Sequence, residues 1–451
     1  MYVLIATGVG AAAIAVVLTL IVRGIGRAAG VMDKPDGFRK VNPRQLPRLG
    51  GVAIFFAVFG AMAGAAAFSG PGVIRDYLFT RDFLTLFLGA AGAMIVGLLD
   101  DIYSVRARYK LILLTLVAAG VYFGGHRITE LTNPLGGSFE LGLAGFVVTV
   151  FWFLACMNAV NLIDGLDGLA SGVAFFAVAT LLVTGFTINQ TSGVLLSVAL
   201  LGALVGFLYF NFYPASIFLG DSGSYLLGFL IAFIGSSTAQ KSNTVVALLI
   251  PIIALGLPFM DTTMAILRRW SRALPMSAAD RQHIHHRLLD MGLSHRQAVL
   301  ALYLGCVILA AFALTMNVTK GAASLWVLLG LGAFFVLVMN TLGRIELELL
   351  RERFFGLMDS GRRDGEIRKA GFEAVERFRR AADLPALWDV LHTVAERLEL
   401  DSVEVTLRSG GEPYAWTRPN DPAESPPDAT WRAAITLKTD DLLWGEVVFV
   451  K

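Results

Sequence analysis

Long apolar segments recur along this chain and decide what it can fold into. Between Met1 and Asn340, runs of about twenty residues with few charges follow one another, separated by short polar connections. A helix of about 20 residues crosses a hydrocarbon core of about 30 Å and satisfies its backbone hydrogen bonds internally. Hydrophobic residues make up 56% of the 451 residues, and charged residues only 16%. The sequence therefore predicts an all-α polytopic membrane protein over most of its length.

Hydropathy along the chain indicates about eleven transmembrane helices. A window of about 19 residues places them at residues 1–22, 50–69, 83–99, 109–125, 142–159, 168–187, 193–212, 223–238, 244–267, 298–317 and 322–342. The first segment is not preceded by a basic region, and its positive charges, Arg23 and Arg27, follow it. Because a secretory signal peptide has the opposite arrangement, we expect this segment to be retained as a span.

The connections between these spans alternate in charge. One set, residues 23–49, 100–110 and 268–297, holds sixteen Lys and Arg residues, whereas the opposite set holds five. Connections that carry the excess of Lys and Arg stay in the cytoplasm, so we expect the first set on that side of the membrane. With eleven spans, the N-terminus then lies outside and the C-terminal region in the cytoplasm.

The composition of the chain changes near residue 343. Up to that point there are 21 basic and 14 acidic residues, and beyond it 16 basic and 21 acidic. We therefore predict a transmembrane domain at residues 1–343 and a cytoplasmic accessory domain at residues 344–451. In the second domain, helical apolar spacing is followed by strand-like alternation, which predicts a small α+β fold. That pattern is loosely similar to a truncated GAF-like sensor domain.

Five aspartates occur where predicted spans end. Asp100 and Asp101 stand in "GLLDDIYSV", Asp164 and Asp167 in "NLIDGLDGLA", and Asp221 in "IFLGDSGSY". On the predicted topology, all three connections emerge on the cytoplasmic face. Asp at a membrane surface often only caps a helix, and that interpretation suffices for one or two of these residues. It does not explain five carboxylates on one face.

Carboxylates gathered at the mouth of a helix bundle repel one another unless a cation joins them. Oxygen ligands without Cys or His favour Mg²⁺, with Mn²⁺ as the alternative, over zinc. The two cysteines, Cys156 and Cys306, lie inside apolar runs and predict neither a disulfide nor a metal site. Mg²⁺ usually combines one or two carboxylates with substrate phosphates, so the acids indicate phosphoryl chemistry.

A basic, histidine-containing connection follows later in the chain. The stretch "DRQHIHHRLL" contains His283, His285, His286 and Arg287, groups that suit a diphosphate. The excess of positive charge expected in any cytoplasmic connection explains the arginines around it, but not three histidines in four residues. A zinc site is the other interpretation of the histidines. Asp261 lies inside a predicted span, as a functional candidate or as the partner of a buried arginine.

Four motifs in this order carry a resemblance to a known family: "GLLDD", "NAVNLIDGLDGLA", "FLGDSGS" and "DRQHIHHRLL". Over residues 1–343 the chain resembles the polyprenyl-phosphate N-acetylhexosamine-1-phosphate transferases, glycosyltransferase family 4, and in particular the bacterial undecaprenyl-phosphate GlcNAc-1-phosphate transferases. The resemblance implies Mg²⁺-dependent transfer from a UDP-sugar to undecaprenyl phosphate, which gives undecaprenyl-diphospho-sugar and UMP. It also implies a multi-pass protein of the bacterial inner membrane whose active site faces the cytoplasm.

The resemblance also implies roles for individual residues near the reacting phosphates. Asp221 is the expected Mg²⁺ ligand, and Asp100 and Asp101 are the acids at the phosphates. Asp100 is the candidate base for the lipid phosphate, and a covalent phospho-aspartyl route is the alternative. Lys110 is the expected charge partner of a phosphate.

Further roles concern the nucleotide sugar. Asn161 and Asp164 are expected to hold the nucleotide and metal region, Asp167 the uracil, and Phe218 to stack on that base. His285 and His286 are expected to contact the diphosphate. The remaining substrate-binding candidates are His283, Arg287 and Arg48, the last in a basic loop that suits a lipid phosphate or orients the chain.

Some alternatives stay open. Asn42 stands where the family has His, which leaves the role of that position undefined. "HIHHRLL" differs from the three consecutive histidines of MurNAc-pentapeptide transferases and favours an unmodified aminosugar over UDP-MurNAc-pentapeptide. The rival hypothesis from another class is a transporter, in which acids are expected near the middle of the spans. We expect membrane lipids and no nucleic acid as partners, and a homodimer is left open.

Overall fold

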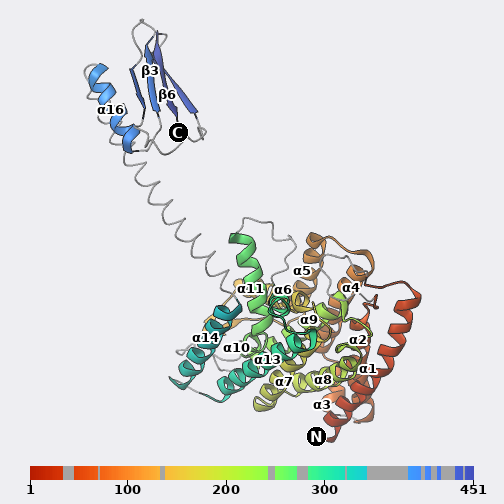
Figure 1. The fold of residues 1–451 in the computed structure, drawn as a ribbon. Coiled ribbons are helices and arrows are strands. Elements are labelled where there is room, and N and C mark those ends of the chain that lie inside the picture. Colours follow the sequence, from red (N-terminus) through yellow and green to blue (C-terminus); the bar gives the residue numbers. More distant parts are fainter. Residues whose placement is uncertain are drawn as a thin grey trace. The chain divides into compact units, whose positions relative to one another are not determined.

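The structure is a computed structural model of the chain (Figure 1). It describes residues 1–33, 45–69, 72–132, 138–241, 249–271, 283–319, 322–342, 384–397, 402–407, 414–417, 432–439 and 442–450. The chain divides into two compact units, an N-terminal unit at Met1–Glu348 and a C-terminal unit at Leu349–Lys451. The boundary predicted at residues 343/344 falls in a stretch outside the described residues.

The N-terminal unit consists almost wholly of helices. In chain order its elements are α1 (Tyr2–Ala28), α2 (Gly50–Phe68), α3 (Val73–Leu78), α4 (Arg81–Tyr103), α5 (Ala107–Phe123), β1 (Glu130–Thr132), β2 (Ser138–Glu140), α6 (Ala144–Ile163), α7 (Leu169–Thr187), α8 (Thr191–Asn211), α9 (Gly220–Lys241), α10 (Leu249–Ala254), α11 (Gly256–Ser271), α12 (Ile284–Asp290), α13 (His295–Val318) and α14 (Ala322–Leu342). The strands β1 and β2 pair antiparallel as a short hairpin between α5 and α6.

Eight of the described helices are long and apolar enough to cross a membrane: α1, α2, α4, α6, α7, α8, α13 and α14. The chain is therefore a largely helical, polytopic membrane protein, whereas the predicted number of eleven spans is not confirmed. The span predicted at 244–267 is described from residue 249 onward, and that part forms two shorter helices, α10 and α11, which meet at Leu255. Gly256 and Pro258 begin the second of them, where a proline removes no helical hydrogen bond.

Small residues let the helices of this unit approach closely. A Cβ added at Gly202 of α8 would lie 2.1 Å from the carbonyl oxygen of Gly8 on α1, and one at Gly206 would lie 2.4 Å from that of Ala12. Such backbone contact is the usual way in which helices associate in lipid, where apolar burial alone gives little preference. The pair α1 and α8 therefore packs through backbone rather than through large side chains.

Helix α9 occupies the centre of the N-terminal unit, among α2, α4 and α6 (Figure 1). Its residues from Ser222 to Thr238 are buried, including Phe229 and Leu230. A helix that is buried all around must satisfy any polar group at its two ends with partners from other helices. Both ends of α9 are sites of such polar contacts.

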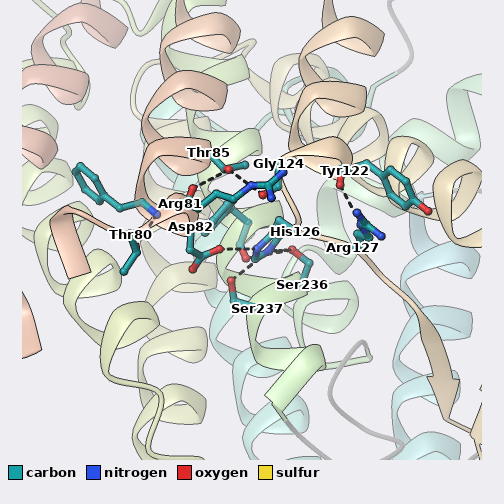
Figure 2. A network of polar contacts seen from close by, with 12 residues as sticks. Thr80, Arg81, Asp82, Thr85, Tyr122, Gly124, His126, Arg127, Ser236 and Ser237 are labelled. Carbon is teal, nitrogen blue, oxygen red and sulfur yellow. Dashed lines mark hydrogen bonds and ion pairs between the residues drawn. The ribbon is translucent and has the colours of Figure 1, made fainter. Parts of the chain in front are cut away.

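The later end of α9 meets a polar network around His126, which follows α5 (Figure 2). The ring is 3% exposed and stacks on Phe233 with a centroid separation of 3.9 Å. His126 Nε2 lies 2.8 Å from Ser236 Oγ and 3.2 Å from Ser237 Oγ, and Nδ1 lies 3.3 Å from Asp82 Oδ1. This network joins the beginning of α4, the end of α5 and the end of α9.

We expect His126→Ala to destabilise the N-terminal unit by roughly 2–4 kcal/mol, because it opens a cavity beside Phe233 and removes buried hydrogen bonds. Unfolding in detergent, followed by circular dichroism, measures the change. Arg127→Ala is the matched control, because Arg127 is exposed and contacts Tyr122 at the surface. Equal unfolding temperatures for both variants would contradict a stabilising role of the network.

The C-terminal unit contains α16 (Leu384–Arg397), β3 (Ser402–Leu407), β4 (Tyr414–Thr417), β5 (Arg432–Thr439) and β6 (Leu442–Val450). The strands form one antiparallel sheet in the order β4-β3-β6-β5. Leu391 and Ala395 of α16 pack with Val403, Val405 and Val447 of the sheet. The described part thus combines the two element types that the sequence pattern indicates, and the likeness to a GAF-like domain stays a prediction.

Candidate active site

Four helix ends meet at the end of the bundle opposite His126. Helices α4 and α6 finish there, and α5 and α9 begin there. Asp101 on α4 accepts hydrogen bonds from the backbone N–H groups of Asp221 (2.9 Å) and Ser222 (3.0 Å) at the beginning of α9. A carboxylate satisfies the unpaired N–H groups of a helix N-terminus and is favoured by its dipole. Asp101 therefore holds the start of α9 against α4.

Two glycines make this junction tight. A Cβ at Gly97 of α4 would lie 2.2 Å from the carbonyl oxygen of Asp221, and one at Gly51 of α2 would lie 2.3 Å from the amide nitrogen of Gly223. Gly220 has a φ of +74°, a region that favours glycine, and its position leaves no room for a Cβ beside the carbonyl of Arg48. The start of α9 is therefore set by backbone contacts with α2 and α4.

The polar centre of the site is a contact between one ammonium group and two carboxylates. Lys110 Nζ on α5 lies 2.6 Å from Asp100 Oδ2 and 3.5 Å from Asp221 Oδ2. Asn161 Nδ2 on α6 donates to Asp221 Oδ1 (3.0 Å) and to Ser224 Oγ (2.9 Å). Four predicted site residues from four different helices are thus within direct contact of one another.

Asp164 follows directly after α6 and is half-buried. Burial raises the pKa of its carboxyl well above the usual range, and the negative charge of Asp221 raises it further, whereas the Arg48 guanidinium lowers it. Four carboxyl groups, those of Asp100, Asp101, Asp164 and Asp221, thus lie near the ammonium group of Lys110, while Arg48 pairs with Asp33. Carboxyl groups crowded in this way either take up protons, as the raised pKa of Asp164 indicates, or share a bound cation.

Arg48 comes from the connection that precedes α2. Its Nη2 atom lies 2.5 Å from Asp33 Oδ1. The same connection pairs with the segment before α9, since the Phe218 N–H donates to the Pro47 carbonyl (2.8 Å) and the Gly50 N–H to the Phe218 carbonyl (3.2 Å). Phe218 is half-buried at this junction. These contacts place the predicted loop residues Arg48 and Phe218 beside the start of α9.

The histidine motif reaches the aspartate motif through one contact. A Cβ at Gly165 would lie 2.3 Å from His285 Nε2, so the imidazole packs directly on the backbone after Asp164. His285 is 3% exposed, and its ring centroid lies 4.4 Å from that of His286. Burial, and next the neighbouring His286, lower the pKa of His285 to about 3. His285 is therefore neutral at pH 7 and can offer a hydrogen bond but not a charge.

The other residues of the histidine motif lie on or beside the short helix α12. His283 precedes the helix and is buried, and His286 and Arg287 are half-buried in its first turn. Asp261 on α11 accepts from the Ile284 N–H and contacts His283 Nδ1, both at 2.9 Å. Asp261 thus contacts the histidine motif, and both interpretations of it, as a functional candidate and as the partner of a buried arginine, stay predictions.

Asp167 follows Asp164 by three residues and bonds to other segments of the chain. It is 3% exposed, its Oδ2 atom accepts from the Ala215 N–H (2.9 Å), and its own N–H donates to His295 Nε2 (3.0 Å). These bonds tie the loop after α6 to the segment before α9 and to the start of α13. Because both bonds join Asp167 to protein groups, its contact with uracil stays a prediction.

Several site residues were not anticipated from the sequence. Ser224 follows Asp221 by three residues, one helical turn, so it lies on the same face and was open to prediction from spacing. Asp33 is one of two acids in a mainly basic loop, which was a usable signal. The contact between Gly165 and His285 has no local signal, because the two residues are far apart in the chain. Asn42 lies outside the described residues.

Carboxylate oxygens are the main donors that the site offers to a metal ion. Among the residues that the structure describes, no group of three or more His, Cys, Asp or Glu side chains is arranged to hold an ion. Asp100 and Asp221 bring two carboxylates together at Lys110. Such a set fits Mg²⁺, which is commonly bound by one or two carboxylates together with substrate phosphates. It does not fit a closed zinc site of four protein ligands.

Known proteins share long stretches of this sequence. The sequence model of glycosyl transferase family 4 matches residues 83–238, which include α4, α6 and most of α9. The probable undecaprenyl-phosphate N-acetylglucosaminyl 1-phosphate transferase of Bacillus subtilis is 36% identical over 340 residues, 75% of this chain and 90% of the relative. The decaprenyl-phosphate N-acetylglucosaminephosphotransferase of Mycobacterium tuberculosis is 32% identical over 325 residues, 67% of this chain and 80% of the relative.

A more distant relative is the undecaprenyl-phosphate alpha-N-acetylglucosaminyl 1-phosphate transferase of Escherichia coli. It is 27% identical over 296 residues, which cover 64% of this chain and 77% of the relative. The matches to these three relatives are far longer than the four motifs that carry the resemblance. This chain belongs to glycosyl transferase family 4, the polyprenyl-phosphate N-acetylhexosamine-1-phosphate transferases.

Proposed function

We propose that this chain transfers N-acetylglucosamine 1-phosphate from UDP-GlcNAc to undecaprenyl phosphate and releases UMP. The observation that carries the proposal is the meeting of Asp100, Lys110, Asn161 and Asp221, from four helices, at one end of the bundle. The names of the relatives supply the lipid and the sugar. Such a reaction begins the synthesis of a lipid-linked glycan of the bacterial cell envelope at the cytoplasmic face of the inner membrane.

The bond changes of this reaction are simple. An oxygen of the lipid phosphate attacks the phosphorus that carries the sugar, the P–O bond of the diphosphate bridge breaks, and UMP leaves. A phosphate monoester has a second pKa of about 6, so the attacking group is mostly a dianion at neutral pH. It therefore needs little help from a base. The contact of Asp100 with Lys110 supports a role for Asp100 in orienting the ammonium group.

Charge compensation is the main requirement, because a phosphate dianion and a diphosphate repel each other. Asp221 is the proposed Mg²⁺ ligand, and the excess of carboxylates at the site supports a divalent cation there. When bound, Mg²⁺ would supply positive charge to the phosphates of the reaction. Lys110 and Arg48 add the positive charge of the protein itself, and neutral His285 adds a hydrogen bond.

A transporter would place its acids near the middle of the bundle. Asp100, Asp164 and Asp221 instead lie at helix ends or directly beyond them. Asp261 is the exception among the predicted candidates, and it contacts the histidine motif. The arrangement therefore favours an enzyme, with another UDP-N-acetylhexosamine or UDP-MurNAc-pentapeptide as the alternative donor.

The proposal is tested with the purified full-length chain in detergent, supplied with undecaprenyl phosphate, Mg²⁺ and UDP-sugars. We expect UMP release with UDP-GlcNAc, a slower reaction with UDP-GalNAc, and none with UDP-MurNAc-pentapeptide. Treatment with EDTA should stop UMP release, and adding Mg²⁺ or Mn²⁺ should restore it. Absence of lipid-dependent UMP release with all three donors would overturn the proposed function, and activity that EDTA leaves unchanged would remove the metal.

A further inference from the structure

Asp261 is a buried acid for which the proposed chemistry has no direct use. It lies in the second turn of α11, is 1% exposed, and makes contacts with a segment 22 residues further along the chain. One oxygen accepts from the Ile284 N–H, and the other lies 2.9 Å from His283 Nδ1. A carboxylate held this deeply is costly unless its partners are well placed. The two contacts of Asp261 therefore need to be considered one by one.

The first contact sets the beginning of α12. Ile284 is the first residue of that helix, and its N–H has no partner within the helix. His283, the residue before the helix, makes no side-chain capping bond. Asp261 supplies the missing acceptor from another helix. The backbone that carries His285 and His286 is thereby attached to α11.

The second contact sets the state of His283. A carboxylate accepts only, so the bond requires a proton on His283 Nδ1. In this orientation the His283 ring is nearly parallel to the His285 ring, with an interplanar angle of 3° and a centroid separation of 5.8 Å. The orientation of His283 therefore limits where the His285 ring can lie.

His285 receives the effect of both contacts. Its Nε2 side packs on Gly165 of the aspartate motif, and its Nδ1 atom is buried with no hydrogen-bond partner among the described residues. A buried polar atom without a partner is costly, so its exception in a native fold needs an explanation, and a bound substrate group would supply one. A small rotation of α12 would move this ring away from Gly165.

We propose that Asp261 is a positioning residue for the transfer of the sugar phosphate: it orients His283 and the start of α12, and these hold His285 against Gly165 for the diphosphate. The proposal rests on the proposed function for its kinetic consequence, but not for its structural one. The groups that orient metal-bound histidines give the scale, since removing one typically costs about 10–100-fold in metal affinity or activity. In this proposal Asp261 acts through His283 and α12 and not on the substrate directly.

The experiment replaces Asp261 by Asn, which keeps the shape but changes the acceptor pattern. An amide offers one oxygen, so if that oxygen accepts from Ile284, its NH₂ group faces His283 Nδ1 and requires the proton on Nε2 instead. The chain has six histidines, which makes ¹⁵N-histidine NMR of the full-length protein practical. We expect His283 to carry its proton on Nδ1 in the wild type and on Nε2 in Asp261→Asn.

Kinetics give the second readout. We expect kcat/KM for UDP-GlcNAc to fall about 10–100-fold in Asp261→Asn, with the KM for undecaprenyl phosphate unchanged. Asp290→Asn is the matched control, since Asp290 ends the same helix and is exposed. An equal fall of kcat/KM for UDP-GlcNAc and for undecaprenyl phosphate would indicate a merely structural role and would overturn the proposal.

The two proposals fail separately. No UMP release by the wild type would remove the proposed function, while the tautomer of His283 still tests the positioning role. A wild-type His283 protonated on Nε2, or unchanged kinetics in Asp261→Asn, would overturn the positioning role alone. If Asp261→Asn does not fold, as judged by its unfolding temperature, the tautomer in the wild type decides.

Discussion

Asp221→Asn is expected to lower the rate of UMP release by about 10²–10³-fold, the usual effect of removing one group that stabilises the reacting charge. The amide keeps the size of the side chain but carries no negative charge for a cation or for Lys110. The backbone N–H of Asp221 still donates to Asp101, so the start of α9 keeps its bond to α4. Initial rates over a series of Mg²⁺ concentrations measure the effect.

The unfolding temperature of this variant should change by only a few degrees, because an Asp side chain beside other carboxylates stabilises the fold little. Asp76→Asn is the matched control, since Asp76 is exposed on α3, the helix that precedes the opposite end of α4. A variant at position 221 with wild-type rates at low Mg²⁺ would remove Asp221 from the site.

Gly97→Ala is expected to have the second large effect. The new Cβ would lie 2.2 Å from the carbonyl oxygen of Asp221 and 2.4 Å from the amide nitrogen of Ser222. These are backbone atoms, so the start of α9 must move away from α4. Overpacking of this kind costs about 1–3 kcal/mol. A displacement of about 1 Å in a catalytic group can cost about 10²-fold in rate.

UMP release and the unfolding temperature of Gly97→Ala should therefore both fall. Gly64→Ala on α2 is the control, because a Cβ at that position meets no atom within 4 Å. The same substitution in open space tests for a general effect of losing glycine, which in a helix is slightly stabilising. If Gly97→Ala kept full activity, α9 would not need its contact with α4 to place Asp221.

The sequence alone predicted much about the site. The apolar runs predicted the polytopic class, and the four motifs predicted the family that the relatives confirm. The distribution of Lys and Arg predicted the orientation in the membrane, which stays a prediction. The expectation that acids from distant segments meet agrees with the contacts of Asp100 and Asp221 with Lys110. The basis of this expectation was the predicted topology, in which these helix ends lie on one side of the membrane.

The number of spans was less accessible. The run at 244–267 is largely apolar, and hydropathy does not register that Gly256 and Pro258 divide it. Helix α5 has 17 residues and is shorter than each of the eight helices that are long enough to cross a membrane. Hydropathy averages over a window, whereas a helix break depends on one or two residues.

What the sequence by itself determined was the class of protein, the family, and the side of the bundle where the polar residues gather, because each depends on composition and order along the chain. Only the tertiary structure decided which group each acid serves. Asp101 binds the backbone of α9, Asp167 the backbone of Ala215, and Asp261 the histidine motif. All three are aspartates, so residue type does not distinguish their partners. A hydrogen bond depends on distances of about 3 Å, and these exist only once the helices have packed.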